Sequence, residues 1–220
     1  MINGVRFKVC GLTSLVDAEA SDSVGADYLG FILYPKSPRY VSLAQFAAMA
    51  PRLPPRKKVA VVVDPTLEAL AEIKTAGFDY LQVHFSPTTP LATVTRWLEV
   101  IPRKMLWLAP RVPPGQELES GLIALVDHVL LDTYHPEAHG GTGRTGDWTS
   151  FKVLSSGFPH VNWILAGGLN PNNIAAALAA TGARWVDVNS GIESAPGVKD
   201  HAKLQAFVTA LRQVPSNPSL

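Results

Sequence analysis

The residue types best suited to chemistry in this sequence lie at the ends of apolar runs. The only cysteine, Cys10, closes the run Val5–Val9 and is followed at once by Gly11. A cysteine thiolate can accept a proton, and glycine amides next to a helix start can bind an anion. Two glycine turns also close apolar runs near the other end of the chain, Ala166-Gly167-Gly168 and Asn189-Ser190-Gly191.

The position of these residues predicts that they meet. The carboxyl ends of parallel strands all point to one face of a sheet or barrel. We therefore expect the thiol and the two glycine turns to share one mouth, an arrangement typical of an enzyme that acts on a phosphorylated small molecule.

Cys10 has two interpretations. Most free cysteines are buried small hydrophobes, whereas a thiol at a strand end can act as a general base. A free thiol has a pKa of about 8.5, so the second role needs nearby positive charge or N–H donors. Lys8 lies two residues earlier on the same side of the strand, where it would favour the thiolate or form a structural ion pair.

Asp132 ends the apolar run Val129-Leu130-Leu131. An aspartate at such a position is costly to bury without a partner or a function. It is either a cap or turn residue, or a general acid kept protonated by an apolar pocket. The glycine-rich loop that follows, 139–146, makes Gly141 and Gly143 candidates for substrate contact, although it lacks the ending of a P-loop.

The turn at Gly167 and Gly168 precedes a predicted helix with Asn170 as N-cap and Pro171 at its first position. Exposed glycine amides and the positive end of the helix dipole would suit a phosphate dianion. Ser190 and Gly191 add a hydroxyl and a second turn, and loops after the seventh and eighth strands form the usual phosphate site of a (βα)8 barrel. The alternative is two ordinary glycine turns.

Three further residues are candidates for substrate binding. Arg39 follows the second predicted strand, where it would clamp a carboxylate or lie on the surface as an ordinary arginine. Gln82 and His84 share one face of the fourth strand and would face a ligand or form a core pair. No metal site is predicted, because the sequence offers no metal-ligand spacing.

A weak repeat predicts the fold that positions these residues. Gly25, Gly77 and Gly182 each suit the end of a helix and precede a polar residue, an aromatic residue and a strand-like run. They are 52 and 105 residues apart, close to two and four units of about 26 residues, and the chain holds roughly eight such units. We predict an α/β fold, a single-domain (βα)8 TIM barrel over residues 1–220. The predicted strands are Val5–Cys10, Tyr28–Leu33, Lys58–Val63, Tyr80–His84, Met105–Leu108, His128–Asp132, Val161–Ala166 and Trp185–Asn189.

Composition agrees with a globular enzyme. The 220 residues are 47% hydrophobic and 17% charged, with a net charge of +1. No global field would attract nucleic acid or an anionic membrane surface. The uncharged stretch 153–183 is broken by Gly, Pro and Asn, so we reject a membrane span. The N-terminus lacks signal-peptide order, and we expect a cytoplasmic monomer or homodimer.

Collinear motifs across most of the chain resemble phosphoribosylanthranilate isomerase of tryptophan biosynthesis. Each motif is weak alone, but their order and joint presence over residues 8–200 are specific. They are Lys8-Val9-Cys10-Gly11-Leu12-Thr13, Ser37-Pro38-Arg39, Leu131-Asp132 with Gly140-Gly141-Thr142-Gly143 and Asp147-Trp148, Leu165-Ala166-Gly167-Gly168-Leu169, and Asp187-Val188-Asn189-Ser190-Gly191-Ile192-Glu193 with Gly197-Val198-Lys199-Asp200.

The resemblance implies an Amadori rearrangement of N-(5-phosphoribosyl)anthranilate to 1-(2-carboxyphenylamino)-1-deoxyribulose 5-phosphate, without a metal or redox cofactor. Asp132 would be the general acid that opens the ribose ring. Cys10, as thiolate, would remove the C2 proton. Arg39 would hold the anthranilate carboxylate, and the Gly167-Gly168 and Ser190-Gly191 loops would bind the phosphate.

Four positions depart from the family pattern. Phe85 replaces a glycine after the fourth strand, and Gly146 replaces a phenylalanine after the glycine-rich loop. Asn189 replaces a serine, and Asp64 stands where an aromatic residue is common. These departures concern substrate fit and the loop-closing contacts, and none removes the acid, the base or the phosphate donors.

Other readings are weaker. The isomerase of histidine biosynthesis performs the same rearrangement with two aspartates, so Cys10 disfavours it and also a dual-substrate enzyme. Indole-glycerol-phosphate synthase would need a lysine acid and a longer N-terminal extension. A catalytically silent phosphate-binding barrel would need only the glycine loops, so the presence of both Cys10 and Asp132 argues against it.

Overall fold

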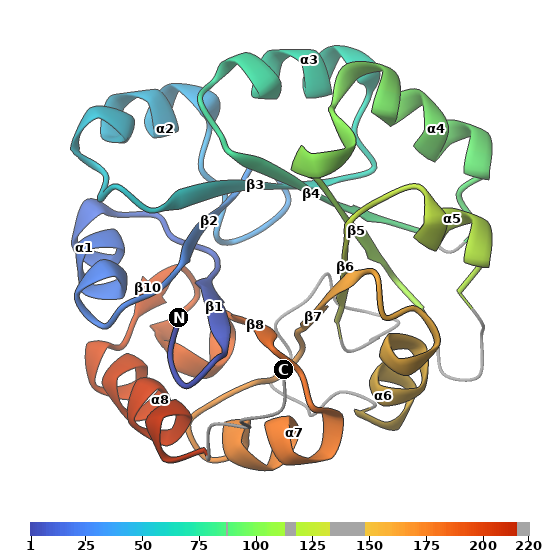
Figure 1. The fold of residues 1–220 in the computed structure, drawn as a ribbon. Coiled ribbons are helices and arrows are strands. Elements are labelled where there is room, and N and C mark those ends of the chain that lie inside the picture. The colour runs from blue at the N-terminus through green and yellow to red at the C-terminus, as the bar shows by residue number, and fades with distance from the viewer. Residues whose placement is uncertain (87, 113–117, 133–147, 215–220) are drawn as a thin grey trace.

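The structure, a computed structural model, is a closed barrel of eight parallel strands surrounded by helices (Figure 1). It describes residues 1–86, 88–112, 118–132 and 148–214. Neighbouring strands follow chain order, and β1 pairs with β8 to close the ring. The predicted (βα)8 barrel is therefore confirmed. The strands are β1 Arg6–Val9, β2 Tyr28–Ile32, β3 Lys57–Val63, β4 Tyr80–Phe85, β5 Leu106–Pro110, β6 His128–Leu131, β7 Asn162–Leu165 and β8 Trp185–Val188.

Helices follow the strands on the outside of the ring (Figure 1). After β8 the chain forms a short 3-10 turn, Ser190–Ile192, and a small antiparallel pair, β9 Glu193–Ala195 with β10 Val198–Lys199. The helices are α1 Leu15–Ser23, α2 Leu43–Met49, α3 Leu67–Thr75, α4 Leu91–Val100, α5 Ser120–Ala124, α6 Trp148–Gly157, α7 Ile174–Thr181 and α8 His201–Gln213, with 3-10 turns at Ala50–Arg52 and Arg103–Met105.

All eight predicted strands are present, with ends displaced by no more than two residues. The predicted start of the helix after β7 is wrong, because α7 begins at Ile174 and not at Pro171. The reason is local side-chain hydrogen bonding. Asn173 Oδ1 accepts from the Asn170 amide at 2.8 Å, and Asn170 Oδ1 accepts from the Asn172 amide at 2.9 Å. Asparagine side chains thereby hold this segment as a turn.

The repeat has a clear structural basis. Gly25, Gly77 and Gly182 have φ of +92°, +92° and +68°, the left-handed region that ends a helix at low cost for glycine. The aspartates that follow two of them bind a neighbouring strand. Asp27 accepts from the Phe7 amide at 3.0 Å and Asp79 from the Lys58 amide at 2.8 Å. Each unit therefore ends a helix and fixes the start of a strand pair.

The amino-terminal end of the barrel is filled by stacked aromatic rings. Tyr28, Trp107 and Trp185 lie within 5.2–5.8 Å of one another, centroid to centroid. The Arg6 guanidinium lies 4.8 Å above the Trp185 ring. Side chains of alternate residues fill the interior in layers, as barrels of this size require. Because this end is packed, the open end that can hold a ligand is at the carboxyl ends of the strands.

His128 gives this packed end a pH-dependent stability. Its ring stacks on Trp107 at 5.5 Å, and burial lowers the pKa of His128 to about 4. The unfolded histidine titrates near 6.5, so the full stabilisation is present above pH 6.5 and is lost as pH falls toward 4. When the pH falls from 7.5 to 5, we expect protonation linked to His128 to lower the free energy of unfolding by about 1–2 kcal/mol. This figure allows for partial solvent screening.

Urea unfolding of the wild type and of His128→Phe at both pH values measures this effect. Phenylalanine keeps the ring packing and removes the titration. The difference in stability between the two proteins should change by about 1–2 kcal/mol over this pH interval. Parallel pH profiles for the two proteins would contradict the assignment to His128.

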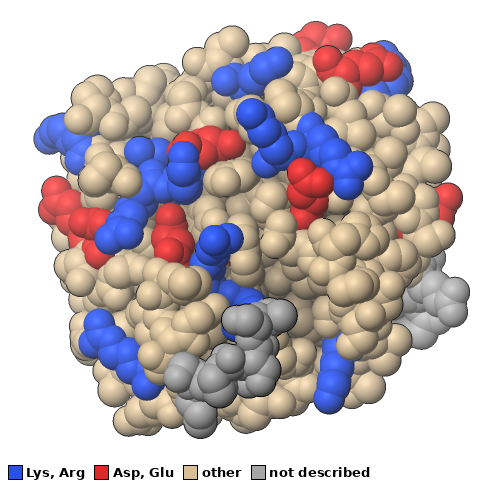
Figure 2. Space-filling view, viewed as in Figure 1, with Lys and Arg blue, Asp and Glu red and all other residues tan. Residues whose placement is uncertain are grey.

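Charges on the molecular surface are mixed in sign. On the face shown in Figure 2, Lys and Arg lie beside Asp and Glu. Ion pairs of the molecule include Lys57 with Asp79 at 2.7 Å and Arg103 with Asp127 at 2.6 Å. In the described ranges, no helix is both long and apolar enough to cross a membrane.

Candidate active site

The barrel brings Cys10 and Asp132 to the same open end. Cys10 follows β1 directly, Asp132 follows β6 directly, and all eight strands run in parallel. On β1 the buried Lys8 points inward, and on β6 Leu130 belongs to the cluster that fills the barrel. Strand alternation therefore places residues 10 and 132 inward as well. The two residues lie three strands apart around the ring, on different sides of one mouth.

A buried ion pair lies beneath Cys10. Lys8 Nζ bonds Asp187 Oδ2 at 2.9 Å across the β1–β8 pair. Burial lowers the pKa of Lys8, but Asp187 and the Cys10 sulfur outweigh this effect and raise it. Burial and Asp187 raise the pKa of Cys10, against the opposing influence of Lys8 and Lys199. Lys8 and Lys199 thus favour the thiolate form of Cys10, while burial and Asp187 oppose it.

Gly30 of β2 provides the space for this arrangement. A Cβ added at Gly30 would lie 2.7 Å from Lys8 Cε and 3.1 Å from the Cys10 Cα. Real Cβ atoms essentially never lie as close to another atom as this Cβ would lie to Lys8 Cε, and few lie as close as it would lie to the Cys10 Cα. The Lys8 side chain or the strand would therefore have to move. Glycine at position 30 therefore lets the Lys8 side chain pass under Cys10. Sequence reasoning did not identify Gly30, since a single glycine inside a strand gives no sign of what packs on it.

The two glycine loops are in direct contact. Gly167 and Gly168 have φ of +89° and +64°. In the part of the chain that the structure describes, neither amide donates a hydrogen bond. A Cβ added at Gly191 would overlap the carbonyl oxygen of Leu169 and lie 2.8 Å from Asn170 Cβ. Gly191 therefore allows the loops after β7 and β8 to pack closely against each other.

Arg39 lies in a buried charge cluster beside Cys10. Its Nε and Nη2 donate to the Glu193 carboxylate at 2.9 and 2.7 Å. Lys199 Nζ donates to the same carboxylate at 2.9 Å and to Asn189 Oδ1 at 2.9 Å. Arg39 and Lys199 therefore share one carboxylate, and burial lowers the pKa of Lys199 although Glu193 opposes this effect.

Comparisons with known proteins decide the family. A family model described as N-(5'phosphoribosyl)anthranilate (PRA) isomerase matches residues 7–210. N-(5'-phosphoribosyl)anthranilate isomerase of Cereibacter sphaeroides is 41% identical over 215 residues, which cover 95% of this chain and 99% of the relative. The chain belongs to the phosphoribosylanthranilate isomerase family. It is an isomerase of tryptophan biosynthesis, as the sequence motifs predict.

Solved structures agree with this family. Phosphoribosyl anthranilate isomerase of Thermotoga maritima has a TM-score of 0.80 and 31% identity, covering 94% of this chain and 98% of the other. A phosphoribosyl anthranilate isomerase in complex with reduced 1-(o-carboxyphenylamino)-1-deoxyribulose 5-phosphate has a TM-score of 0.75 and 29% identity, with coverage of 94% and 98%. The barrel described above is thus the fold of the isomerase family.

The remaining candidates of the isomerase site lie at different depths. Gln82 is buried on β4, and its Nε2 lies 2.8 Å from Nε2 of His84, which is nearer the rim. Gln82 Oε1 is buried without a hydrogen bond to any described residue. Lys8 is buried two residues before Cys10, and its ammonium bonds Asp187. Gly141 and Gly143 lie outside the described residues.

Three departures from the isomerase pattern have structural explanations. Phe85 points away from the barrel interior and packs edge-on against Trp97 of α4, with centroids 5.4 Å apart. The Asn189 side-chain oxygen accepts a hydrogen bond from the Lys199 ammonium. Asp64 has a φ of +43°, a conformation that aspartate tolerates better than a bulky residue. Gly146 lies outside the described residues.

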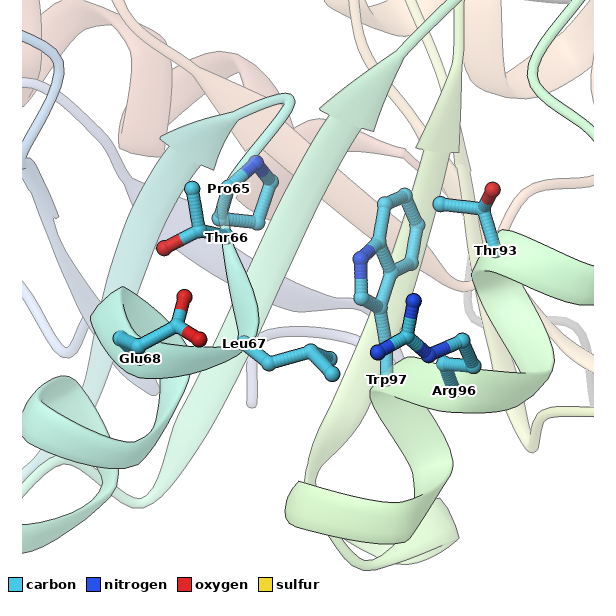
Figure 3. Close-up of a pocket in the computed structure, with 7 residues that line it drawn as sticks. All are labelled: Pro65, Thr66, Leu67, Glu68, Thr93, Arg96 and Trp97. Atoms are coloured by element: carbon cyan, nitrogen blue, oxygen red, sulfur yellow. The ribbon is translucent and has the colours of Figure 1, made fainter.

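A shallow hollow outside the barrel is separate from the isomerase site. It lies between the first turns of α3 and α4 (Figure 3). The Glu68 backbone and the Thr66 hydroxyl lower the pKa of Glu68, an effect typical of a helix N-terminus. The hollow contains neither Cys10 nor Asp132. Its lining residues are Pro65, Thr66, Leu67, Glu68, Thr93, Arg96 and Trp97.

Proposed function

We propose that Asp132 and Cys10 carry the two proton transfers of the isomerase reaction. The Asp132 carboxylic acid gives its proton to the ribose ring oxygen, the ring C1–O bond breaks, and the anthranilate nitrogen forms an iminium with C1. The Cys10 thiolate then takes the C2 proton, and the C2–H electrons form the enolamine, which tautomerises to the ketone. The iminium acidifies the C2–H bond, so a thiolate is basic enough. The position of Cys10 and Asp132 on different sides of one barrel mouth carries this proposal.

The anionic ends of the substrate would be held by the two remaining groups of the site. The amides of Gly167, Gly168 and Gly191, with the Ser190 hydroxyl, would bind the phosphate. Arg39 would bind the anthranilate carboxylate through the edge of its guanidinium that Glu193 does not occupy.

The other substrate contacts follow from the fold. Gln82 and His84 would line the mouth from β4, Gly141 and Gly143 would cover the substrate, and Lys8 would act from below. We propose that residues 1–220 form one domain that works in the cytoplasm as a monomer or homodimer. The Thermotoga maritima isomerase is dimeric, which supports the homodimer.

Turnover by purified protein tests the proposed function directly. Phosphoribosylanthranilate is fluorescent, so the wild type should remove its signal at a rate proportional to enzyme concentration. The aminoketose phosphate should accumulate in equal amount. Loss of fluorescence without this product, or no loss at all, would contradict the proposal.

Gly191→Ala tests the phosphate site. The added methyl group must push the loops after β7 and β8 apart, because Leu169 O occupies its position. We expect inorganic phosphate to bind about 10- to 100-fold more weakly, in line with loss of one or two charge-assisted hydrogen bonds. Calorimetric titration with phosphate measures this change. Gly157→Ala, at a helical glycine with open space around it, is the control and should bind phosphate as the wild type does.

A further inference from the structure

Glu193 is the centre of the charge cluster beside Cys10. Its carboxylate accepts from Arg39 Nε at 2.9 and 3.1 Å, from Arg39 Nη2 at 2.7 Å, from Lys199 Nζ at 2.9 Å and from the Gly197 amide at 3.2 Å. Burial alone would raise the pKa of Glu193, but Arg39 and Lys199 outweigh it and lower the pKa. The carboxylate is therefore charged and fully occupied by groups of this chain.

The contact with Glu193 leaves one edge of Arg39 for a ligand. A guanidinium has two edges that can bind a carboxylate through parallel hydrogen bonds, one at Nε and Nη2 and one at Nη1 and Nη2. Glu193 takes the first edge. Within the described part of the chain, no hydrogen bond is formed at Nη1. A second carboxylate can therefore meet Arg39 only at its terminal edge.

The stem of Arg39 is fixed against the residue that follows Cys10. A Cβ added at Gly11 would lie 2.8 Å from Arg39 Cδ and 2.6 Å from Asn189 Oδ1. Arg39 thus lies over the Cys10-Gly11 turn, next to the proton acceptor of the proposed reaction. A guanidinium held at both its stem and its Nε edge has little freedom left.

Glu193 also ties the loops together. The Gly197 carbonyl accepts from the Thr13 hydroxyl at 2.6 Å, so the segment between β9 and β10 is joined to the loop after β1. Arg39 belongs to the loop after β2. The Glu193 carboxylate therefore joins the loop after β2 to the segment after β8, and the Thr13 contact extends this link to the loop after β1.

We propose that Glu193 is a positioning residue that holds Arg39 so that its terminal edge meets the carboxylate of the substrate. This inference rests on the proposed role of Arg39. Glu193 acts through Arg39 and does not itself touch the substrate, because its oxygens are already occupied. The expected signature is a loss of carboxylate recognition, with recognition of the rest of the ligand unchanged.

Two ligands isolate this signature. One is reduced 1-(o-carboxyphenylamino)-1-deoxyribulose 5-phosphate, and the other is the same compound without its carboxyl group. The ratio of their dissociation constants, measured by calorimetry, reports carboxylate recognition alone. In the wild type we expect the carboxylate to improve binding about 10- to 100-fold. In Glu193→Gln and in Arg39→Met this ratio should fall by about tenfold or more, while the carboxyl-free ligand binds within about twofold of the wild type.

The variants separate the possible failures. Glu72→Gln removes an exposed carboxylate on α3 and should leave the ratio unchanged. If Arg39→Met keeps the wild-type ratio, the proposed role of Arg39 is wrong. If the ratio falls in Arg39→Met but keeps its wild-type value in Glu193→Gln, the positioning role of Glu193 is wrong.

Glu193→Asp is the second variant, for use if Glu193→Gln does not fold. It keeps the negative charge beside Lys199. Its carboxylate ends one methylene short of the present contact with Nε and Nη2, so Arg39 should shift and the ratio should fall, and an unchanged ratio in this variant would equally overturn the inference.

Discussion

Cys10→Ser is expected to reduce kcat by about 10²- to 10⁴-fold, the usual contribution of a positioned general base. Serine fits the buried site of Cys10, but its hydroxyl is a far weaker acid than a thiol, so almost no alkoxide forms. Stopped-flow or steady-state fluorescence of phosphoribosylanthranilate measures the loss. The affinity for inorganic phosphate, which the glycine loops would bind, should stay within about twofold of the wild type.

The pH profile of the wild type gives an independent check on Cys10. Burial and Asp187 raise the pKa of the Cys10 thiol, and a base acts only when deprotonated. The proposed acid, Asp132, must be protonated at the same time, so kcat/KM should reach a plateau or maximum and then fall at alkaline pH, where the acid has lost its proton. A kcat/KM that keeps rising at alkaline pH, or a Cys10→Ser variant with near-normal kcat, would contradict the proposed pair of roles.

Asp132→Asn is expected to reduce kcat by about 10²- to 10⁴-fold as well, because the amide cannot give a proton to the ring oxygen. The substitution is isosteric, so substrate binding should change little and the loss should appear in kcat, with KM nearly unchanged. The same fluorescence assay measures both constants.

Asp64→Asn is the matched control for Asp132→Asn. Asp64 also follows a strand directly at the open end of the barrel, but its side chain is 55% exposed. Its replacement should leave kcat within about twofold of the wild type. Equal losses in the two variants would mean that charge at this end of the barrel, and not a proton from Asp132, determines the rate.

The strand positions and the end of the barrel that holds the site were predictable because they depend on local pattern. Apolar runs broken by glycine turns define parallel strands covered on both faces, and strand polarity then places Cys10 and Asp132 at one end. The left-handed glycines that end the helices were predictable for the same reason. The start of α7 was not, because the asparagine side chains after Leu169 compete with the backbone in a way that propensity does not describe.

What the sequence determined by itself is the set of candidate groups: one thiol, one acid and the glycine turns, each at the end of an apolar run. What only the tertiary structure decided is the set of partners. Lys8 pairs with Asp187, which lies 179 residues away in the sequence, and Arg39 pairs with Glu193, which lies 154 residues away. Glycine is needed at position 30 because the Lys8 side chain passes beside it. Such contacts depend on barrel closure between β1 and β8, which brings distant residues into one buried volume where each charge needs a counter-charge.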